Sequence, residues 1–352
     1  MNTLEKVQAS LDKYNIDGLI VSNPTNRRYL TGFTGTFGVA LISKNDAKFI
    51  TDFRYTEQAT NQAIGYEVIE NRNTTKEIAK LTKDMRLSTL GFEEEYVSFK
   101  QYNLFTEHID AKLHPISGLI EDLRKLKSQE EITKIKKAAA ISDKAFGKIL
   151  SDLRPGISEM EINNKLELYM REEGATSSSF DMIIASGFRS AMPHGIASNK
   201  KINHGDLVTL DFGALYEGYR SDMTRTVAIG NPGSQLKEIY DIVKEALQIG
   251  VNVIKDGVKC KQVDTVVRDY ITNKGYGENF GHGTGHSFGL EIHEGPYFSQ
   301  ESKDVLQTGM VMTVEPGIYL PGLGGVRIED DVVVTDSGHE IITNSLKNLI
   351  VL

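Results

Sequence analysis

The chain of 352 residues contains one cysteine, Cys260. A single cysteine cannot form an internal disulfide, so nothing in the sequence indicates an oxidising compartment. The first residues, MNTLEKVQASLDKYNIDG, are charged and amphipathic and lack the apolar core of a signal peptide. No apolar run approaches the roughly 20 residues that cross a bilayer. We therefore expect a cytoplasmic protein without a membrane partner.

Basic faces and phosphate-binding loops are also missing. The formal net charge is -8, which argues against a nucleic-acid partner because nucleic acid rewards basic surfaces. The glycine-containing stretch TGFTGTFG, residues 31–38, has no lysine and lacks the spacing of a P-loop. The remaining composition, with 39% hydrophobic and 25% charged residues, is that of an ordinary soluble globular protein.

The first third of the chain alternates strand-like and helix-like segments. Amphipathic stretches at 3–14 and 75–85 predict helices. Short apolar runs predict strands at 18–21, 38–42, 48–51 and 66–69. This alternation predicts an α/β domain with a mainly buried sheet.

A long helix is expected to open the second domain. Ser128 and Glu131 form the pattern of a capping box at the start of an amphipathic run that ends before Arg154-Pro155-Gly156. We therefore place the domain boundary within residues 118–128 and expect domains at 1–122 and 123–352.

The second domain repeats itself with an offset of about one hundred residues. Helices expected at 128–153 and from 158 to 174 have counterparts at about 235–255 and 262–274. The strand GDLVTLDFG, starting at Gly205, aligns with GMVMTVEPG. In this alignment the acids also match: Asp211 with Glu315, and Asp222 with Glu329. The repeat predicts two related α/β halves that pack face to face around one shared sheet.

Two aspartates carry the chemical signal of the first half. Asp211 and Asp222 flank Tyr216-Glu217-Gly218, which reads as a hairpin turn. A turn centred between residues 216 and 217 places the two acids directly opposite each other, roughly 5 Å apart. Such a pair needs a cation, a shared proton or solvent, and a bridging divalent metal is the strongest candidate. Taken alone, the pattern also fits a solvated strand pair whose acids face water.

The second half strengthens the metal interpretation. Glu315 and Glu329 flank a glycine-rich turn and face each other if that turn is centred near Gly322. Apolar neighbours such as Val326 and Ile328 indicate partly buried strands, where bare carboxylates are costly. Four inward acids from two matched hairpins therefore predict a metal cage.

Histidines and one arginine complete the pattern. FGHGTGHSFGLEIHEGP contains His282, His286 and His293 and is too glycine-rich for the helix of an HExxH protease. A histidine cluster beside matched carboxylates favours a metal site, and such a ligand set suits Mn²⁺, Co²⁺, Fe²⁺ or Zn²⁺ better than Ca²⁺. His194, in the turn-like SAMPHG, fits an ordinary loop residue equally well. Arg327 shares a strand face with the second glutamate and is expected to position a ligand or contact substrate, or to form a surface ion pair.

These motifs resemble the pita-bread metallopeptidase family of prolidase, aminopeptidase P and methionine aminopeptidase. The stretches PHG, GHGTGHS, HEGP, VEPGIY and VRIEDD resemble family motifs over residues 120–352. The earlier stretch GLIVSNPTNRRYLTGF resembles the N-terminal domain of the creatinase and prolidase branch. The resemblance implies an α/β (α+β) chain in which an N-terminal creatinase-like domain precedes a duplicated pita-bread catalytic domain.

The resemblance also implies a site with two divalent metal ions, with Mn²⁺ expected and Co²⁺, Fe²⁺ or Zn²⁺ as alternatives. The family order of ligands, Asp, Asp, His, Glu, Glu, maps onto Asp211, Asp222, His286, Glu315 and Glu329. Catalytic roles are expected for His194, His293, Glu315 and Arg327. Substrate contacts are expected from His194, His282, His293 and Arg327. A peptide substrate and a homodimer are implied in the same way.

The implied activity is hydrolysis of Xaa-Pro bonds, foremost in dipeptides. The N-terminal domain argues against methionine aminopeptidase, and the filled ligand positions argue against a metal-free hydrolase like creatinase. Tyr297 stands where many prolidase-like members carry the Arg of HExPR, and it cannot offer a cationic fork to a dipeptide carboxylate. Aminopeptidase P activity on longer peptides is therefore an alternative. A catalytically silent module that binds peptides or proteins is an alternative of another class.

Overall fold

The computed structural model describes residues 1–352, which form two compact units, Met1–Arg124 and Lys125–Leu352. The first unit contains one six-stranded sheet with the order β4-β3-β2-β1-β5-β6. Its strands are β1 (Gly18–Val21), β2 (Val39–Ser43), β3 (Ala47–Thr51), β4 (Glu67–Glu70), β5 (Thr89–Glu93) and β6 (Lys112–Ile116). Its helical segments are α1 (Thr3–Ser10), η1 (Leu11–Tyr14), α2 (Pro24–Thr31), α3 (Thr56–Gln62), α4 (Thr74–Asp84), α5 (Phe99–His108) and α6 (Leu119–Lys125).

The apolar runs of the first unit locate its early strands. β1 is buried at every position, as expected for a central strand between β2 and β5. β4 lies at the sheet edge with exposed and half-buried positions, whereas β2, β3 and β5 are buried at most positions, so the expectation of a mainly buried sheet is confirmed. β5 and β6 were not expected, because their short apolar runs are interrupted by Gly91 and Pro115.

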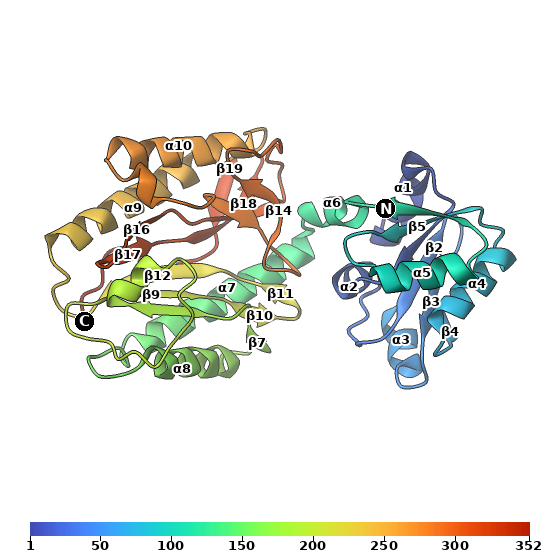
Figure 1. The fold of residues 1–352 in the computed structure, drawn as a ribbon, viewed down its shortest axis with the longest axis horizontal. Coiled ribbons are helices and arrows are strands. Elements are labelled where there is room, and N and C mark those ends of the chain that lie inside the picture. The colour runs from blue at the N-terminus through green and yellow to red at the C-terminus, as the bar shows by residue number, and fades with distance from the viewer. The chain divides into compact units, whose positions relative to one another are not determined.

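The second unit holds two pairs of helices with strands between them (Figure 1). The helices are α7 (Gln129–Ile149), α8 (Glu159–Glu172), α9 (Ser234–Asn252) and α10 (Cys260–Asn273), with short turns η2 (Gly187–Ala191) and η3 (Gly277–Asn279). The capping box at the start of α7 is confirmed: the Ser128 hydroxyl accepts from the Glu131 N–H, and the Glu131 carboxylate accepts from the Ser128 N–H. No helix has the length and apolar character needed to cross a membrane.

The strands of the second unit do not form the single shared sheet that the repeat predicted. They are divided among a five-stranded, two three-stranded and one two-stranded hydrogen-bonded sheet. The strands are β7 (Ser177–Ser178), β8 (Ile183–Ser186), β9 (Leu207–Phe212), β10 (Ala214–Tyr216), β11 (Tyr219–Arg220), β12 (Met223–Ala228), β13 (Gly285–Ser287), β14 (Glu294–Phe298), β15 (Val311–Val314), β16 (Gly317–Leu320), β17 (Gly324–Arg327), β18 (Asp330–Thr335) and β19 (Gly338–Ile341). One apolar core packs α7 and α8 on β9 and β12, and another packs α9 and α10 on β15, β17 and β18. Each half therefore has its own core.

The register of the first hairpin corrects one expectation. Its turn is Glu217-Gly218, with φ of 49° and 86°, one position later than expected. Asp211 consequently pairs with Thr224 and does not lie directly opposite Asp222. Side chains alternate with a period of two along a strand. Asp222, two positions before Thr224, therefore still projects to the side of Asp211.

The second hairpin has the register that a turn at Gly322 predicts. Gly317 pairs with Arg327 on one side of the glutamates, and Val314 pairs with Asp330 on the other. Both pairs keep the same sum of residue numbers, so Glu315 and Glu329 occupy matching positions between them. The halves meet here, since the Glu329 N–H donates to the Thr224 carbonyl across 3.1 Å.

Candidate metal centre

A cavity of about 400 Å³ is lined by residues of both halves of the second unit. Asp211 comes from β9, Asp222 from the segment before β12, and His286 from β13. Glu315 follows β15 and Glu329 precedes β18. All nine residues expected at the site line this cavity: His194, Asp211, Asp222, His282, His286, His293, Glu315, Arg327 and Glu329.

Three carboxylates meet at the base of this site. Asp211, Asp222 and Glu329 are buried, and each offers an oxygen within 4.8 Å of the others. Asp211 Oδ1 and Glu329 Oε1 are buried and have no hydrogen-bond partner. Unpaired anionic oxygens inside a protein are costly. This donor set therefore fits a divalent cation, which would satisfy the orphaned oxygens and offset the mutual repulsion.

Burial and mutual repulsion raise the pKa values of Asp222, Glu315 and Glu329. Burial, followed by the charges of Glu329 and Asp211, raises the pKa of Asp222 well above its usual value. Burial and the charge of Glu315 raise the pKa of Glu329 in the same way. Burial also raises the pKa of Glu315 to about 7. Without a cation, the cluster holds protons that separate carboxylates would release.

His286 links the carboxylate cluster to Glu315. Its Nε2 lies 3.5 Å from Glu315 Oε1 and 3.7 Å from Asp222 Oδ2. Its Nδ1 lies 3.1 Å from the Ser287 carbonyl, which can only accept, so Nδ1 carries the proton. Burial lowers the pKa of His286 to about 4, which leaves the ring neutral near pH 7. Nε2 therefore presents a free lone pair toward the acids, as a metal-ligating imidazole does.

Arg327 is buried, so the surface ion pair considered from the sequence is excluded. Its guanidinium donates to Asp211 Oδ2 and, across 2.9 Å, to the hydroxyl of Tyr319. It also donates to the Pro193 carbonyl across 3.2 Å and to Thr224 Oγ1 across 3.2 Å. Arg327 thus fixes one oxygen of Asp211 and leaves the other unpaired.

The remaining histidines occupy the wall of the cavity. The rings of His286 and His293 are 4.6 Å apart in an edge-to-face arrangement. Burial, followed by the charge of His194, lowers the pKa of His293. His282 Nε2 lies 2.8 Å from the Tyr319 hydroxyl, and burial lowers the pKa of His282 to about 4. Tyr319, which the sequence analysis missed, therefore connects His282 to Arg327.

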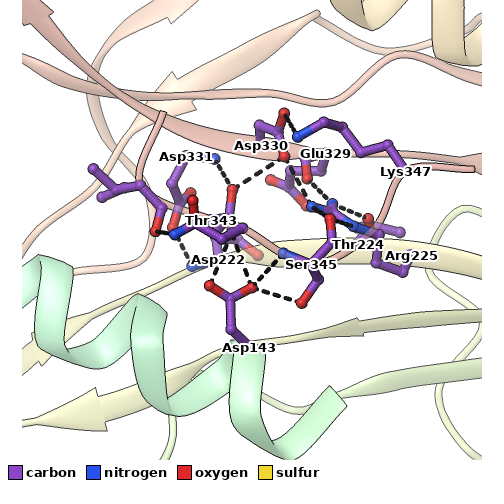
Figure 2. Close-up of polar contacts among 12 residues, drawn as sticks. Asp143, Asp222, Thr224, Arg225, Glu329, Asp330, Asp331, Thr343, Ser345 and Lys347 are labelled. Carbon is purple, nitrogen blue, oxygen red and sulfur yellow. Dashed lines mark hydrogen bonds and ion pairs between the residues drawn. The ribbon is translucent and has the colours of Figure 1, made fainter. Parts of the chain in front are cut away.

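Further polar residues form hydrogen bonds with the acids and with their main chain (Figure 2). Thr224 Oγ1 donates to Glu329 Oε2 across 2.7 Å, and Asp331 Oδ2 accepts from the Asp222 N–H across 3.0 Å. The Arg225 guanidinium donates to the Glu329 carbonyl and, across 2.9 Å, to Asp330. Thr224 and Asp331 each follow a predicted ligand by two positions. Strand alternation places each of them on the same face as that ligand, but it does not identify the distant segment that each one contacts.

Two buried carboxylates anchor the loops that carry the histidines. In the second half, Asp264 of α10 accepts from the N–H and hydroxyl of Thr284 across 3.1 and 2.9 Å. The Thr284 carbonyl in turn accepts from the Glu315 N–H. In the first half, Glu159 of α8 accepts from the N–H of Ser186 and of Ser198, at the two ends of the loop that carries His194.

These anchors give contrasting predictions. Asp264→Asn replaces an acceptor facing an N–H by an amide, so the loop of His286 and the main chain of Glu315 should loosen. We expect Mn²⁺ affinity to fall about 10-fold, as outer-shell changes typically do. Glu159→Gln should leave Mn²⁺ affinity unchanged and lower kcat/KM for peptides, because it touches only the loop of His194. Calorimetric Mn²⁺ titration of both variants checks this, and equal affinities would contradict the role of Asp264.

The metal-free protein is expected to lose stability as pH rises from about 5 to 8. Unfolded Asp and Glu titrate near 3.9 and 4.3, whereas the folded pKa values of Asp222, Glu315 and Glu329 are raised. The folded state then binds more protons than the unfolded state, so stability present at low pH is lost as these groups ionise. Thermal unfolding with chelator, compared with saturating Mn²⁺, measures the effect. The same pH slope in both conditions would contradict it.

Comparisons with known proteins agree with this geometry. The model of metallopeptidase family M24 matches residues 133–336, and the creatinase/prolidase N-terminal domain matches residues 3–126. An uncharacterised peptidase of Bacillus subtilis, YqhT, is 52% identical and is covered over 99% of both chains. The structure of an Xaa-Pro dipeptidase from Bacillus anthracis has a TM-score of 0.98 and 55% identity, with 99% of each chain covered.

A third similar protein is named for a different activity. The structure of an X-Pro aminopeptidase from Thermotoga maritima has a TM-score of 0.92 and 41% identity, and covers 98% of this chain and 100% of its own. The expected fold, a creatinase-type N-terminal domain before a pita-bread catalytic domain, is confirmed by these matches. The buried acids and the matches at full length together show that this chain belongs to metallopeptidase family M24.

Proposed function

We propose that this protein hydrolyses peptide bonds that precede proline, with Xaa-Pro dipeptides as its main substrates. The observation that carries the proposal is the buried cluster of Asp211, Asp222 and Glu329, whose orphaned oxygens fit a divalent cation. The likeness to an Xaa-Pro dipeptidase at 55% identity supports the choice of bond.

The proposed ligands of two divalent ions are Asp211, Asp222, His286, Glu315 and Glu329. We propose Mn²⁺ because carboxylate oxygens with a single imidazole suit it. When bound, the ions would polarise the scissile carbonyl and lower the pKa of a bound water. Arg327 and Tyr319 would keep Asp211 in place through the contacts described above.

Proton movement and charge stabilisation are assigned to the chain's own side chains. Glu315 lines the cavity and would pass a proton to the leaving nitrogen. His194 and His293 line the cavity and would donate hydrogen bonds to the carbonyl oxygen as negative charge develops on it. His282, held by Tyr319, is proposed to contact the substrate.

The apolar wall of the cavity suits a proline ring. Phe180, Ile183 and Ile292 line it beside the polar residues. Proline has no N–H, so its pocket needs apolar surface and no hydrogen-bond acceptor for the amide nitrogen.

Longer Xaa-Pro peptides are a second candidate substrate class. Tyr297 lines the cavity and is 47% exposed. A phenol cannot pair with a dipeptide carboxylate as a guanidinium does. The likeness to an X-Pro aminopeptidase supports this alternative.

The test is a chelator-stripped protein assayed with and without Mn²⁺ or Co²⁺. Hydrolysis of Xaa-Pro dipeptides supports the first proposal, and a preference for Xaa-Pro tripeptides supports the second. Ala-Ala serves as the control without proline. Bound metal without turnover of any peptide would overturn both and favour a silent peptide-binding module, whereas turnover that survives chelation would favour a metal-free hydrolase.

The remaining expectations are kept as proposals. We assign residues 1–122 to the N-terminal domain and 123–352 to the catalytic domain. A homodimer is proposed, and light scattering on the purified protein tests it. A cytoplasmic location is proposed, and cell fractionation tests it.

A further inference from the structure

The sheet of the first unit reverses its strand order beside β1. The chain leaves β1 for β2, β3 and β4 on one side and then returns to β5 and β6 on the other. β1 is parallel to β5, and β5 to β6, so these three strands end at the same edge. In open α/β sheets, ligands bind outside the carboxyl ends of the strands where the order reverses.

A cavity of about 480 Å³ lies at this reversal point, within the first unit. Ser22 follows β1, and Tyr96, Val97 and Ser98 follow β5. Residues 36–39 at the start of β2 and residues of α4 and α5 complete the wall. The volume falls in the range of small-molecule sites.

A buried cation forms part of this wall. Arg27 is 4% exposed, and its terminal nitrogens donate to the carbonyls of Gly38 and Gly35 across 2.6 and 2.8 Å. Its Nε is buried without a hydrogen-bond partner. Carbonyl oxygens are neutral, and the guanidinium is otherwise stabilised only by the face of Phe33 and by the charge of Glu93 at longer range. A buried charge without a direct ion pair favours an anion.

The carboxylate whose charge acts on Arg27, Glu93, is already engaged by other donors. Glu93 Oε2 accepts from the N–H groups of Ser22 and Asn23, and its Oε1 accepts from Asn26. Glu93 therefore occupies the N-terminus of α2 and makes no ion pair with Arg27. No carboxylate of the chain forms an ion pair with the Arg27 guanidinium, which lines the cavity, so its charge is available to another anion.

Two further helices begin at the cavity. Thr74 is the first residue of α4, and Ser98 is the N-cap of α5, and both line the cavity. The positive ends of these helices add to the field of Arg27. The opposite side of the cavity is apolar, with Phe37, Val39, Ile78 and Phe105.

We propose that this cavity of the N-terminal unit binds a small organic carboxylate, with its acid group on Arg27 and its apolar body against the aromatic and branched side chains. A single guanidinium carries one positive charge, which matches a monoanion better than a phosphate dianion. The site lies in a different unit from the metal centre and does not depend on the proposed peptidase activity.

The test uses full-length protein and titrates phenylacetate, isovalerate and inorganic phosphate by calorimetry and ¹H–¹⁵N NMR. Both carboxylates are expected to bind with Kd values below about 10 mM, and more tightly than phosphate. Arg27→Met should weaken phenylacetate at least tenfold. Arg27 also braces residues 35–38, so a second variant, Val97→Trp, fills the cavity while keeping the arginine and should weaken binding to the same extent.

Arg86→Met is the matched control, because Arg86 lies in the same unit, is exposed and does not line this cavity. It should bind phenylacetate like the unaltered protein. Failure of both carboxylates to bind would overturn the proposal. So would phenylacetate binding that persists in both cavity variants and disappears with chelator, since this would place the acid at the metal centre.

Discussion

Asp222→Asn is expected to lower kcat on Xaa-Pro peptides by about 1000-fold or more while the fold survives. Asp222 lies within 4.8 Å of Asp211 and Glu329 through single oxygens, and it alone of the three also approaches His286. An amide removes one negative charge from the set that is proposed to hold both ions. Each tenfold loss corresponds to about 1.4 kcal/mol of barrier, so this effect equals about 4 kcal/mol.

The same substitution should increase the stability of the metal-free protein, although it lowers the activity. A neutral amide at position 222 would relieve the repulsion that raises the pKa of the neighbouring acids. We expect the metal-free variant to unfold at a higher temperature than the metal-free original at pH 8, and at nearly the same temperature at pH 5. A loss of activity caused by misfolding would lower both temperatures.

Asp241→Asn provides the control, since Asp241 is an exposed residue of α9 far in sequence from every proposed ligand. Metal content by mass spectrometry should fall in Asp222→Asn and stay unchanged in the control. Full activity with full metal content in Asp222→Asn would show that the ligand assignment is wrong.

Local patterns located the site because the acids lie on two short hairpins. The register of the second hairpin was predicted from the position of its turn, and the structure places the centre of that turn at Gly322. The first was misplaced by one position because Tyr216-Glu217-Gly218 offers two possible turn centres, and only φ above zero at both Glu217 and Gly218 decides between them. An error of one position in the turn centre shifts the cross-strand partner of Asp211 by two residues. Because side chains alternate with a period of two, the predicted and the observed partner lie on the same face of the strand.

Contacts between distant segments were beyond the sequence. Asp331 holds the main chain of Asp222 across 109 positions, and Asp264 holds Thr284 from a helix. No spacing rule links such pairs, because tertiary packing alone brings them together. The division of the strands into several sheets has the same origin: main-chain pairing between the halves consists of isolated hydrogen bonds such as that of Glu329 with Thr224, and no strand of one half pairs along its length with a strand of the other.

Tyr297→Arg is expected to raise kcat/KM for Xaa-Pro dipeptides at least tenfold relative to Xaa-Pro tripeptides. Tyr297 pairs with His286 in the β13–β14 register and lines the cavity, so a side chain at this position is held next to a proposed metal ligand. A guanidinium there would offer two parallel N–H donors to a dipeptide carboxylate. A tripeptide presents a neutral carbonyl at the same point and gains much less.

Competition from nearby acids should be limited. The Glu294 carboxylate accepts from Lys127 across 3.2 Å and from the Glu291 N–H across 3.0 Å, so it is already engaged. The introduced guanidinium would therefore remain available to substrate. The gain should shrink at high salt, because position 297 is partly exposed and its charge is screened.

Two further variants separate charge from geometry. Tyr297→Lys supplies a point charge without the planar fork and should give a smaller gain for dipeptides. Tyr297→Gln is neutral and should leave the ratio of dipeptide to tripeptide hydrolysis unchanged. Steady-state kinetics on matched substrates such as Ala-Pro and Ala-Pro-Ala measure the ratio. If the arginine and glutamine variants behave alike, a group other than residue 297 selects the length of the substrate, and the aminopeptidase alternative loses the observation that favours it.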